Sequence, residues 1–159
     1  MSSRERTKST SKVADALDDL SLQTMVGFLL RRCRQRALDI YAQEIGHLKL
    51  RPRQFVVLLT IHQNAGINQT DLARLTGIDR STTADMIARL ARRDLIRRER
   101  TDSDQRANIL HVTEHGNDVL NEAVPGMARA QERLLEALPP EMRQSFIECL
   151  MLFADPREE

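Results

Sequence analysis

Residues 68–93 decide the fold of this chain, and they read NQTDLARLTGIDRSTTADMIARLARR. The apolar residues Leu72, Ala73 and Leu75 on one side predict a first helix over about Gln69–Thr76. Gly77 follows at once, and glycine accepts the positive φ that a sharp exit from a helix needs. Ala73 and Gly77 lie four residues apart, where a steep crossing of two helices is expected to need small residues. With a second helix predicted from 80 or 81 to 93, the pattern is typical of a helix-turn-helix.

The two sides of the second helix carry different chemistry. Met86, Ile87 and Leu90 recur at the spacing of an inward-facing stripe. Asp79 or Ser81 can cap the helix, because either side-chain oxygen can accept a free N–H of the first turn. The other side is polar, and its short hydroxyl groups and arginines suit phosphates and base edges. We expect DNA contacts from Arg80, Ser81, Thr82, Thr83, Asp85 and Arg89.

A β-hairpin is predicted directly after this helix. Two short apolar strands flank the polar stretch Thr101–Ala107, which is predicted to be a loop with Arg106 near its tip. One arginine on such a tip suits the narrow and negative minor groove of DNA. Asp102 or Asp104 can hold that arginine by a charge-assisted hydrogen bond. Ile67 is expected to add a one-residue strand beside the hairpin, as the family resemblance given below implies.

Composition and charge agree with a helical protein that has one local basic surface. The chain has 159 residues, enough for one domain, and 41% of them are apolar while only 3% are aromatic. A core of Leu, Ile, Val, Ala and Met favours helices. The net charge is only +1, whereas residues 80–106 hold eight arginines and five acids. Nonspecific affinity for nucleic acid should therefore come from that local patch.

The predicted fold is mainly α with a small β-hairpin wing, and it divides the chain into three parts. Residues 1–20 are expected to be a flexible basic tail with a short helix. Residues 51–113 form the predicted winged helix-turn-helix domain. Residues 21–50 and 114–159 are predicted helices with more apolar surface than one small lobe can bury, so we expect them to pair with a second copy in a homodimer.

Long helices are predicted on both sides of the DNA-binding part. Ser21 is expected to cap a helix over about 22–46, and Pro52 opens the next. Thr113 caps a helix to about 138, with a kink at Pro125, and a last helix follows Pro139-Pro140. The apolar stripe of the first helix is Leu22, Val26, Leu29, Cys33, Ala37 and Ile40. The inner face of the helix after Pro52 is Phe55, Leu58, Leu59 and His62.

The sequence contains no evident catalytic set, so we expect neither an enzyme nor a bound cofactor. Cys33 and Cys149 have no histidine at motif spacing, and no glycine-rich phosphate loop is present. His111 and His115 are four residues apart, but the strand-to-helix junction at Thr113 should separate them, so no metal site is predicted. Cys33 lies between arginines, an environment that can favour a reactive thiolate; the alternative is a small buried apolar residue.

Neither a signal peptide nor a membrane span is predicted. The first twenty residues are mostly polar, and no apolar run approaches the length of a membrane span, Phe55–Leu59 having five residues and Cys149–Ala154 six. We therefore expect a cytoplasmic protein with no membrane partner.

Several short motifs resemble the MarR (multiple-antibiotic-resistance regulator) family of bacterial transcription factors. They are QTDLA at 69–73, STT at 81–83, RL at 89–90, DLI at 94–96, DxDxR at 102–106 and LxVTxxG at 110–116. The likeness covers most of residues 22–153. The family's loop usually reads DPxDRR, whereas this chain has Ser103 and Gln105, so one phosphate or groove contact is expected to be missing. Thr83 stands where the family more often has Val.

The resemblance implies a homodimeric regulator, most simply a repressor, that binds near-palindromic duplex DNA and responds to a small ligand. In MarR-like dimers the ligand, often an aromatic acid, lies between the dimer helices and the DNA-binding lobe. By position, the candidate ligand residues are Arg32, Tyr41, His47 and His62, with Arg32 pairing a carboxylate. The runs LLRR and GIDRSTT look most like regulators of aromatic-acid catabolism, including those of nicotinate breakdown that answer to hydroxylated nicotinic acid.

Two other functions stay open at this point. One is a redox-responsive regulator of the same fold that acts through Cys33. The other is a winged-helix adaptor that binds only proteins, because helix-turn-helix pieces also occur in such proteins.

Overall fold

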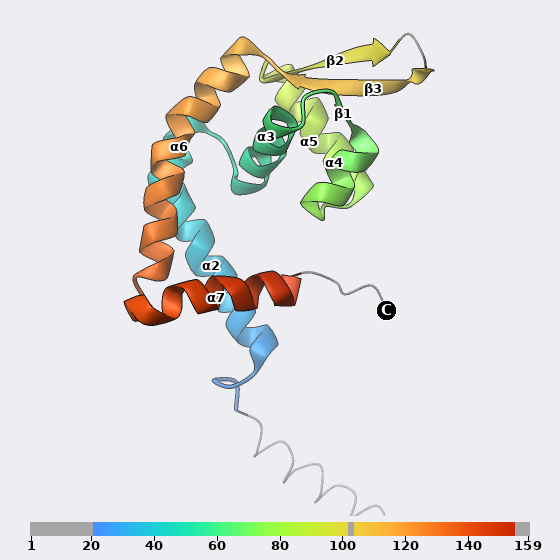
Figure 1. The fold of residues 1–159 in the computed structure, drawn as a ribbon. Helices are drawn as coiled ribbons and strands as arrows, with labels where there is room; N and C mark the ends of the chain where they lie inside the picture. Colours follow the sequence, from blue (N-terminus) through green and yellow to red (C-terminus); the bar gives the residue numbers. More distant parts are fainter. Residues whose placement is uncertain (1–20, 102–103, 155–159) are drawn as a thin grey trace, which may run out of the picture. The chain divides into compact units, whose positions relative to one another are not determined.

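The computed structural model describes residues 21–101 and 104–154, with side chains described for 21–99 and 109–154. The helices are α2 (Val26–Ile45), α3 (Pro52–Gln63), α4 (Gln69–Thr76), α5 (Arg80–Arg92), α6 (Glu114–Leu135) and α7 (Pro140–Ala154) (Figure 1). A 3-10 turn, η1 (Gly46–Leu48), follows α2, and the strands are β1 (Ile67–Asn68), β2 (Ile96–Thr101) and β3 (Asp104–Val112). The predicted fold class, mainly α with a small β wing, is confirmed.

The chain divides into two compact units, and the boundary between Ala37 and Leu38 falls inside α2. The second unit contains all of α3 to α7 and the sheet. The predicted domain boundaries after residues 20, 50 and 113 stay predictions. No helix in the described part of the chain combines the length and the apolarity that crossing a membrane demands.

Helix α3 supplies much of the core of the second unit. Pro52 occupies its first turn, where the missing N–H costs no hydrogen bond. The buried side chains of the helix are Phe55, Val57, Leu58 and Ile61. They cluster with buried residues of the neighbouring elements, namely Leu72, Ile87, Leu90, Leu95, Leu110 and Leu120. The prediction that His62 lies on this inner face is wrong: His62 is exposed, because the buried stripe runs through the residue before it.

The turn between α4 and α5 depends on a glycine. Asn68 caps α4, since its side-chain oxygen accepts the N–H of Asp71 at 2.9 Å. Gly77 ends the helix with a φ of 63°, as the sequence predicts. A Cβ on Gly77 would meet nothing within 4 Å, so the predicted close crossing of two helices at this glycine is wrong. The position favours glycine because of its positive φ, not because space is short. Leu75, predicted on the apolar side of α4, is 51% exposed.

Strand β3 is the central strand of a three-stranded antiparallel sheet with the order β1-β3-β2. Ile67 pairs with Leu110, which confirms the predicted short strand beside the hairpin. The hairpin is longer than predicted. Strand β2 extends to Thr101 and β3 begins at Asp104, so the predicted loop over Thr101–Ala107 is wrong. Polar side chains in this stretch favoured a loop in the sequence analysis. Strand pairing depends on main-chain hydrogen bonds, which polar residues can also form.

Helix α6 begins where the sequence predicts. The side-chain oxygen of Thr113 accepts the N–H of Gly116 at 3.0 Å, so the predicted cap is confirmed. Pro125 lies inside the helix without ending it, and the predicted kink there stays a prediction. The helix ends at Leu135, about one turn earlier than expected.

The end of α2 and the middle of α6 pack closely within the second unit. A Cβ on Gly126 would lie 2.7 Å from the Ile45 side chain and 2.9 Å from the main-chain oxygen of Glu44. The Glu44 side chain, 14% exposed, accepts hydrogen bonds from Arg129 at 2.8 Å and Arg133 at 2.7 Å. These bonds, that from Arg129 first, lower the pKa of Glu44 against the opposing effect of burial.

The first long helix begins later than predicted. Helix α2 starts at Val26, not near residue 22, because Ser21 closes a separate turn in which its hydroxyl oxygen accepts the N–H of Gln23 at 3.3 Å. Ile40 of the predicted apolar stripe is buried. The more N-terminal members of the stripe are exposed, namely Leu22, Val26, Leu29 and Cys33.

Helix α7 also carries many exposed apolar side chains. They are Met142, Phe146, Ile147, Leu150, Met151, Leu152 and Phe153. Large exposed apolar areas are uncommon on proteins that act as monomers, so this helix is a candidate contact surface.

Candidate nucleic-acid interface

The start of α5 is fixed by Asp79. One carboxylate oxygen of Asp79 accepts the main-chain N–H of Thr82 at 2.9 Å and the hydroxyl of Ser81 at 2.8 Å. Bonds from the Thr82 main chain, the Thr82 hydroxyl and Ser81, in that order, lower the pKa of Asp79 to about 2. Of the two predicted caps, Asp79 is therefore the one used, and it stays ionised at neutral pH.

Four of the predicted DNA-contacting side chains of α5 are exposed. They are Arg80, Ser81, Asp85 and Arg89, while Thr82 beside them is half-buried. Ser81 donates its hydroxyl hydrogen to Asp79, so its oxygen remains available to accept a hydrogen bond. The inward side of the helix is held by Ile87 and Leu90, both fully buried. The polar face of α5 is thus presented outward by a helix anchored in the core.

Thr83 is the exception among the predicted contacts. Its side chain is 0% exposed, and its hydroxyl donates to the main-chain oxygens of Asp79 at 2.9 Å and Ile78 at 3.2 Å. A direct contact between this side chain and DNA is therefore excluded in this conformation, and that prediction is wrong. Thr83 instead ties the first turn of α5 to the turn before it.

The wing places two further predicted contacts, Asp104 and Arg106, on β3. Their side chains lie outside the described residues, and so does the predicted partner Asp102. Arg106 belongs to strand β3, in the stretch between Asp104 and Asn108 where the pairing with β2 shifts register and residues 105–107 have no partner on β2. The predicted DNA contacts of Asp104 and Arg106 stay predictions.

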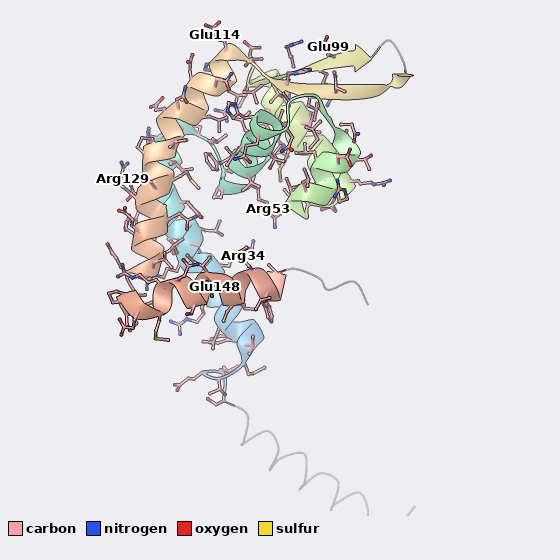
Figure 2. The ribbon with its side chains drawn as sticks, viewed as in Figure 1. Arg34, Arg53, Glu99, Glu114, Arg129 and Glu148 are labelled. Atoms are coloured by element: carbon pink, nitrogen blue, oxygen red, sulfur yellow. The ribbon has the colours of Figure 1, made fainter. Side chains whose placement is uncertain are left out.

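The described base of the wing holds a small charge network that the sequence did not indicate. Glu99 is labelled on β2 in Figure 2. Its Oε2 lies 2.6 Å from Nη1 of Arg97 and 3.5 Å from Nε2 of His111 on β3. Arg97 and His111 are paired across the ladder. Glu99 therefore offsets part of the basic charge at this end of the hairpin, while the neighbouring Arg98 is exposed.

With this geometry in view, comparison with known proteins identifies the fold family. A family model described as "MarR family" matches residues 50–107, which span α3 to the wing. The solved structure of the transcriptional repressor CouR bound to a 23-mer DNA duplex is 32% identical and has a TM-score of 0.79. The match covers 86% of this chain and 99% of that one.

The chain belongs to the MarR family.

Two further relatives of this MarR-family chain are a repressor and a ligand-regulated DNA-binding protein. The HTH-type transcriptional repressor NicR of Pseudomonas putida is 27% identical, and the match covers 98% of both chains. The BpsR structure from Bordetella bronchiseptica, whose DNA binding is described as regulated by 6-hydroxynicotinic acid, is 29% identical with a TM-score of 0.81. That match covers 86% of this chain and 98% of BpsR. The chain is accordingly a MarR-family transcriptional regulator.

The four candidate ligand residues of this MarR-family chain lie in different surroundings. Tyr41 is half-buried, and burial raises the pKa of its hydroxyl. His47 is exposed and lies 3.6 Å from Glu122 of α6. His62 is exposed and shares a 2.8 Å hydrogen bond between its Nδ1 and Oδ1 of Asn117. Arg32 is exposed on the part of α2 that belongs to the first unit.

No recorded contact joins these four residues to one another within the described part of the chain. His62 and His47 each reach α6 through a different partner, Asn117 and Glu122. A shared ligand site that includes all four therefore stays a prediction. Cys33 differs from expectation more clearly: it is exposed in one copy of the chain and is not the buried apolar residue that the alternative supposed.

One residue that holds the site together was missed by the sequence reasoning. Arg93, which follows α5, donates from Nη1 to the main-chain oxygen of Lys49 at 2.8 Å and from Nη2 to that of Leu48 at 3.2 Å. These bonds tie the end of α5 to the segment between α2 and α3. Spacing alone gave no signal for this, because the acceptors are main-chain atoms far away in sequence.

Proposed function

We propose that this MarR-family regulator is a homodimer that represses transcription by binding near-palindromic duplex DNA in the cytoplasm. A small aromatic acid, such as a hydroxylated nicotinic acid, releases it. The protein acts by binding alone, without catalysis, a cofactor or a metal. The two copies of α5 enter successive major grooves about one helical turn apart, and the wings reach the flanking minor grooves.

The observation that carries the DNA-binding part of the proposal is the outer face of α5. Asp79 fixes the start of this helix, and Arg80, Ser81 and Arg89 remain exposed beside it. A helix start rich in short hydroxyl groups lets the main chain approach phosphates, and arginine can read guanine through two hydrogen bonds. The similar protein CouR has been solved bound to duplex DNA.

The homodimer is supported by apolar surface in each of the two units. In the second unit, α7 exposes Phe146, Leu150 and Phe153 among others. In the first unit, Leu22, Val26 and Leu29 are exposed. Covering such side chains with a second copy removes apolar area from water, at roughly 25 cal/mol per Å². A dimer also supplies the twofold symmetry that a near-palindromic operator requires.

The proposed effector class rests on the similarity to two relatives. It does not rest on a ligand pocket in the structure of a single chain. NicR and BpsR are both similar over nearly their whole length, and BpsR is described as regulated by 6-hydroxynicotinic acid. Arg32 offers a cation for the carboxylate, and Tyr41, His47 and His62 offer polar groups for the ring substituents. Such a ligand releases DNA only if it binds the DNA-free arrangement of the dimer more tightly than the DNA-bound one.

The first experiment measures DNA binding and assembly together. Fluorescence anisotropy with a duplex from the chain's own promoter region, compared with a scrambled duplex of equal length, should show sequence-specific binding. Light scattering at the same protein concentration should give the mass of a dimer. A monomer, or equal affinity for both duplexes over a range of salt concentrations, contradicts the proposal; absence of any DNA binding favours the adaptor alternative.

The second experiment tests the effector. 6-Hydroxynicotinic acid, nicotinic acid and benzoic acid are compared for their effect on the melting temperature and on the DNA complex. A ligand that prefers the folded protein raises its melting temperature. We expect 6-hydroxynicotinic acid to have the largest effect, Arg32→Gln to weaken it, and the exposed Arg36→Gln on the same helix to leave it unchanged. No stabilisation and no release by any of the three acids contradicts the effector class.

A redox-responsive regulator is the second candidate, because Cys33 is exposed in one copy of the chain. An accessible thiol between Arg32 and Arg34 can react with peroxide if it is ionised. Treating the wild type and Cys33→Ser with peroxide while DNA binding is monitored decides this candidate. Release that persists in the Cys33→Ser variant eliminates it, and release seen only in the wild type supports it.

A further inference from the structure

A shallow basic hollow lies where the end of α5 meets the start of α3. Its volume is about 320 Å³, and it is lined by Lys49, Arg51, Gln54, Arg89, Arg92 and Arg93. Five of these six residues are cations and none is acidic. Of the five, only Arg89 belongs to the predicted DNA-contacting face. Of the remaining cations, Lys49 and Arg51 lie in the segment before α3, Arg92 ends α5 and Arg93 follows it.

The hollow is held in shape by the two hydrogen bonds from Arg93. They join the end of α5 to the main chain of Leu48 and Lys49, and thereby fix the two basic segments side by side. Lys49 has a φ of 51°, in the left-handed region that residues other than glycine seldom adopt. Strained backbone of this kind persists only where its surroundings hold it, and it occurs often at binding sites.

The cations of the hollow differ from several other arginines of the chain. Arg74, Arg97, Arg129 and Arg133 each pair with a carboxylate, at distances between 2.6 and 3.3 Å. Among the described residues, no carboxylate pairs with any of the five cations of the hollow. The hydrogen bonds that Arg93 makes within the described part of the chain go to neutral carbonyl oxygens, which do not compensate its charge. Bringing uncompensated like charges together costs free energy, and a bound anion offsets that cost.

The first turn of α3 adds neutral donors at the same place. Arg51 occupies the N-cap position and has no side-chain oxygen with which to accept the free N–H groups of the helix start. The Gln54 side chain accepts the N–H of Arg51 itself at 3.0 Å, which is the reverse half of a capping box. The helix is 12 residues long, so its unpaired N–H groups and dipole favour an anion.

We propose that this basic hollow binds a phosphate group. A singly charged carboxylate balances only one of five cations, whereas a phosphate offers more charge and several acceptor oxygens to arginines that approach from two elements. The shallow opening suits a phosphate that remains attached to a larger molecule outside the hollow. Two sources share this chemistry: a phosphodiester of the DNA backbone, and a free phosphate-bearing small molecule.

The first arm of the test needs no DNA. Inorganic phosphate and pyrophosphate are titrated into the full-length protein at constant ionic strength, with chloride as the reference, and binding is read from the melting temperature and from calorimetry. We expect saturable binding by the wild type, weakened at least about tenfold in Arg51→Gln/Arg92→Gln, since charge-assisted hydrogen bonds are lost. Arg51→Lys/Arg92→Lys keeps the charge and should retain more of the binding than the Gln variant.

A matched control guards against a general effect of charge. Arg34→Gln/Arg36→Gln removes two exposed cations from α2 and changes the net charge equally. It should bind phosphate like the wild type. Circular dichroism of all variants in the absence of phosphate checks that they are folded. Equal phosphate binding by the wild type and by Arg51→Gln/Arg92→Gln overturns the proposal if the DNA arm also shows no change.

The second arm identifies the source of the phosphate. If the hollow holds a DNA phosphate, Arg51→Gln should lower the slope of log K against log salt by about one. If it holds a free phosphate compound, that slope stays unchanged while the first arm is positive. The inference does not depend on DNA binding. If the chain binds no duplex, the proposed function is refuted, but the phosphate titration still shows whether the hollow binds phosphate.

Discussion

A Cβ atom placed on Gly116 would lie 2.1 Å from the main-chain oxygen of Leu95. The same oxygen accepts the N–H of Thr113 at 3.1 Å, and the Thr113 hydroxyl donates to the main-chain oxygen of Asp94 at 2.5 Å. The start of α6 therefore packs main chain against main chain on the segment that leads from α5 into the wing. Any side chain at position 116 would push these two segments apart.

Substituting this glycine should destabilise the whole DNA-binding part. Gly116→Ala is expected to lower the free energy of unfolding by about 1–3 kcal/mol, because main-chain atoms cannot move aside as a flexible side chain can. Urea unfolding at fixed protein concentration measures the change. Gly46→Ala is the matched control, since a Cβ on Gly46 meets nothing within 4 Å. Equal unfolding midpoints for the two variants would show that the close approach is unimportant.

The cap on α5 predicts a defined pH dependence. The folded-state pKa of Asp79 is lowered from its ordinary value of 3.8 to about 2, so its ionised form stabilises the fold. This contribution is complete above the ordinary pKa and is lost as the pH falls from 3.8 through about 2. Asp79→Asn keeps an oxygen that can cap but cannot ionise. We expect it to unfold at lower urea than the wild type at pH 6, and the difference to narrow near pH 2.

A matched carboxylate on the same helix provides the control for that measurement. Asp85 is exposed and makes none of the capping bonds, so Asp85→Asn should change the urea midpoint at pH 6 by little. A wild-type advantage over Asp79→Asn that stays constant down to pH 2 would contradict the role given to the ionised cap.

Thr83 and Arg89 should separate stability from DNA recognition. Thr83→Val removes a buried hydroxyl but keeps the shape of the side chain, so we expect DNA affinity to stay within about twofold of the wild type because the side chain is out of reach. Arg89→Gln leaves the core intact and should weaken DNA binding by about 1–3 kcal/mol. Anisotropy titrations and urea unfolding on both variants distinguish the two effects. A large loss of affinity in Thr83→Val without loss of stability would restore Thr83 as a contact.

The wing makes a prediction of its own through Arg106. Arg106→Ala should weaken binding to the operator by about 1–3 kcal/mol and reduce the salt slope by about one, since one phosphate or groove contact disappears. Titrations at several salt concentrations give both quantities. Arg36→Ala, on the exposed side of α2, removes the same charge and should change neither. An unchanged slope and affinity in Arg106→Ala would refute the contact assigned to the wing.

Local sequence signals predicted the helix-turn-helix well because its determinants are short in range. Gly77 fixes the exit from α4, and Asp79 and Thr113 cap the helices that follow them within three residues. The family motifs lie in the same stretch, and so the MarR family was also accessible from the sequence. Such features depend on neighbours along the chain and need no knowledge of the tertiary structure.

Features that depend on distant contacts were not predictable in the same way. The inner face of α3 was placed one residue off at His62, because an apolar neighbour and a histidine both fit the periodicity. The sequence predicted that the Thr83 hydroxyl is exposed. In the structure the side chain is buried, and its hydroxyl donates to the main-chain oxygen of Ile78 in the turn before α5. The length of the hairpin was underestimated since strand pairing is a main-chain property. The basic hollow requires Arg51, just before α3, and Arg92, at the end of α5, to line one site, which no sequence spacing encodes.

Arg93 has one consequence for how this protein can change over evolutionary time. Its guanidinium donates hydrogen bonds to the main-chain oxygens of Leu48 and Lys49 in the segment before α3. Every amino acid has such an oxygen. Substitutions at positions 48 and 49 therefore keep both acceptors for α5, whatever they change in the core contacts of Leu48 or in the charge of Lys49. The arginine itself has no such latitude, because its guanidinium supplies both donors.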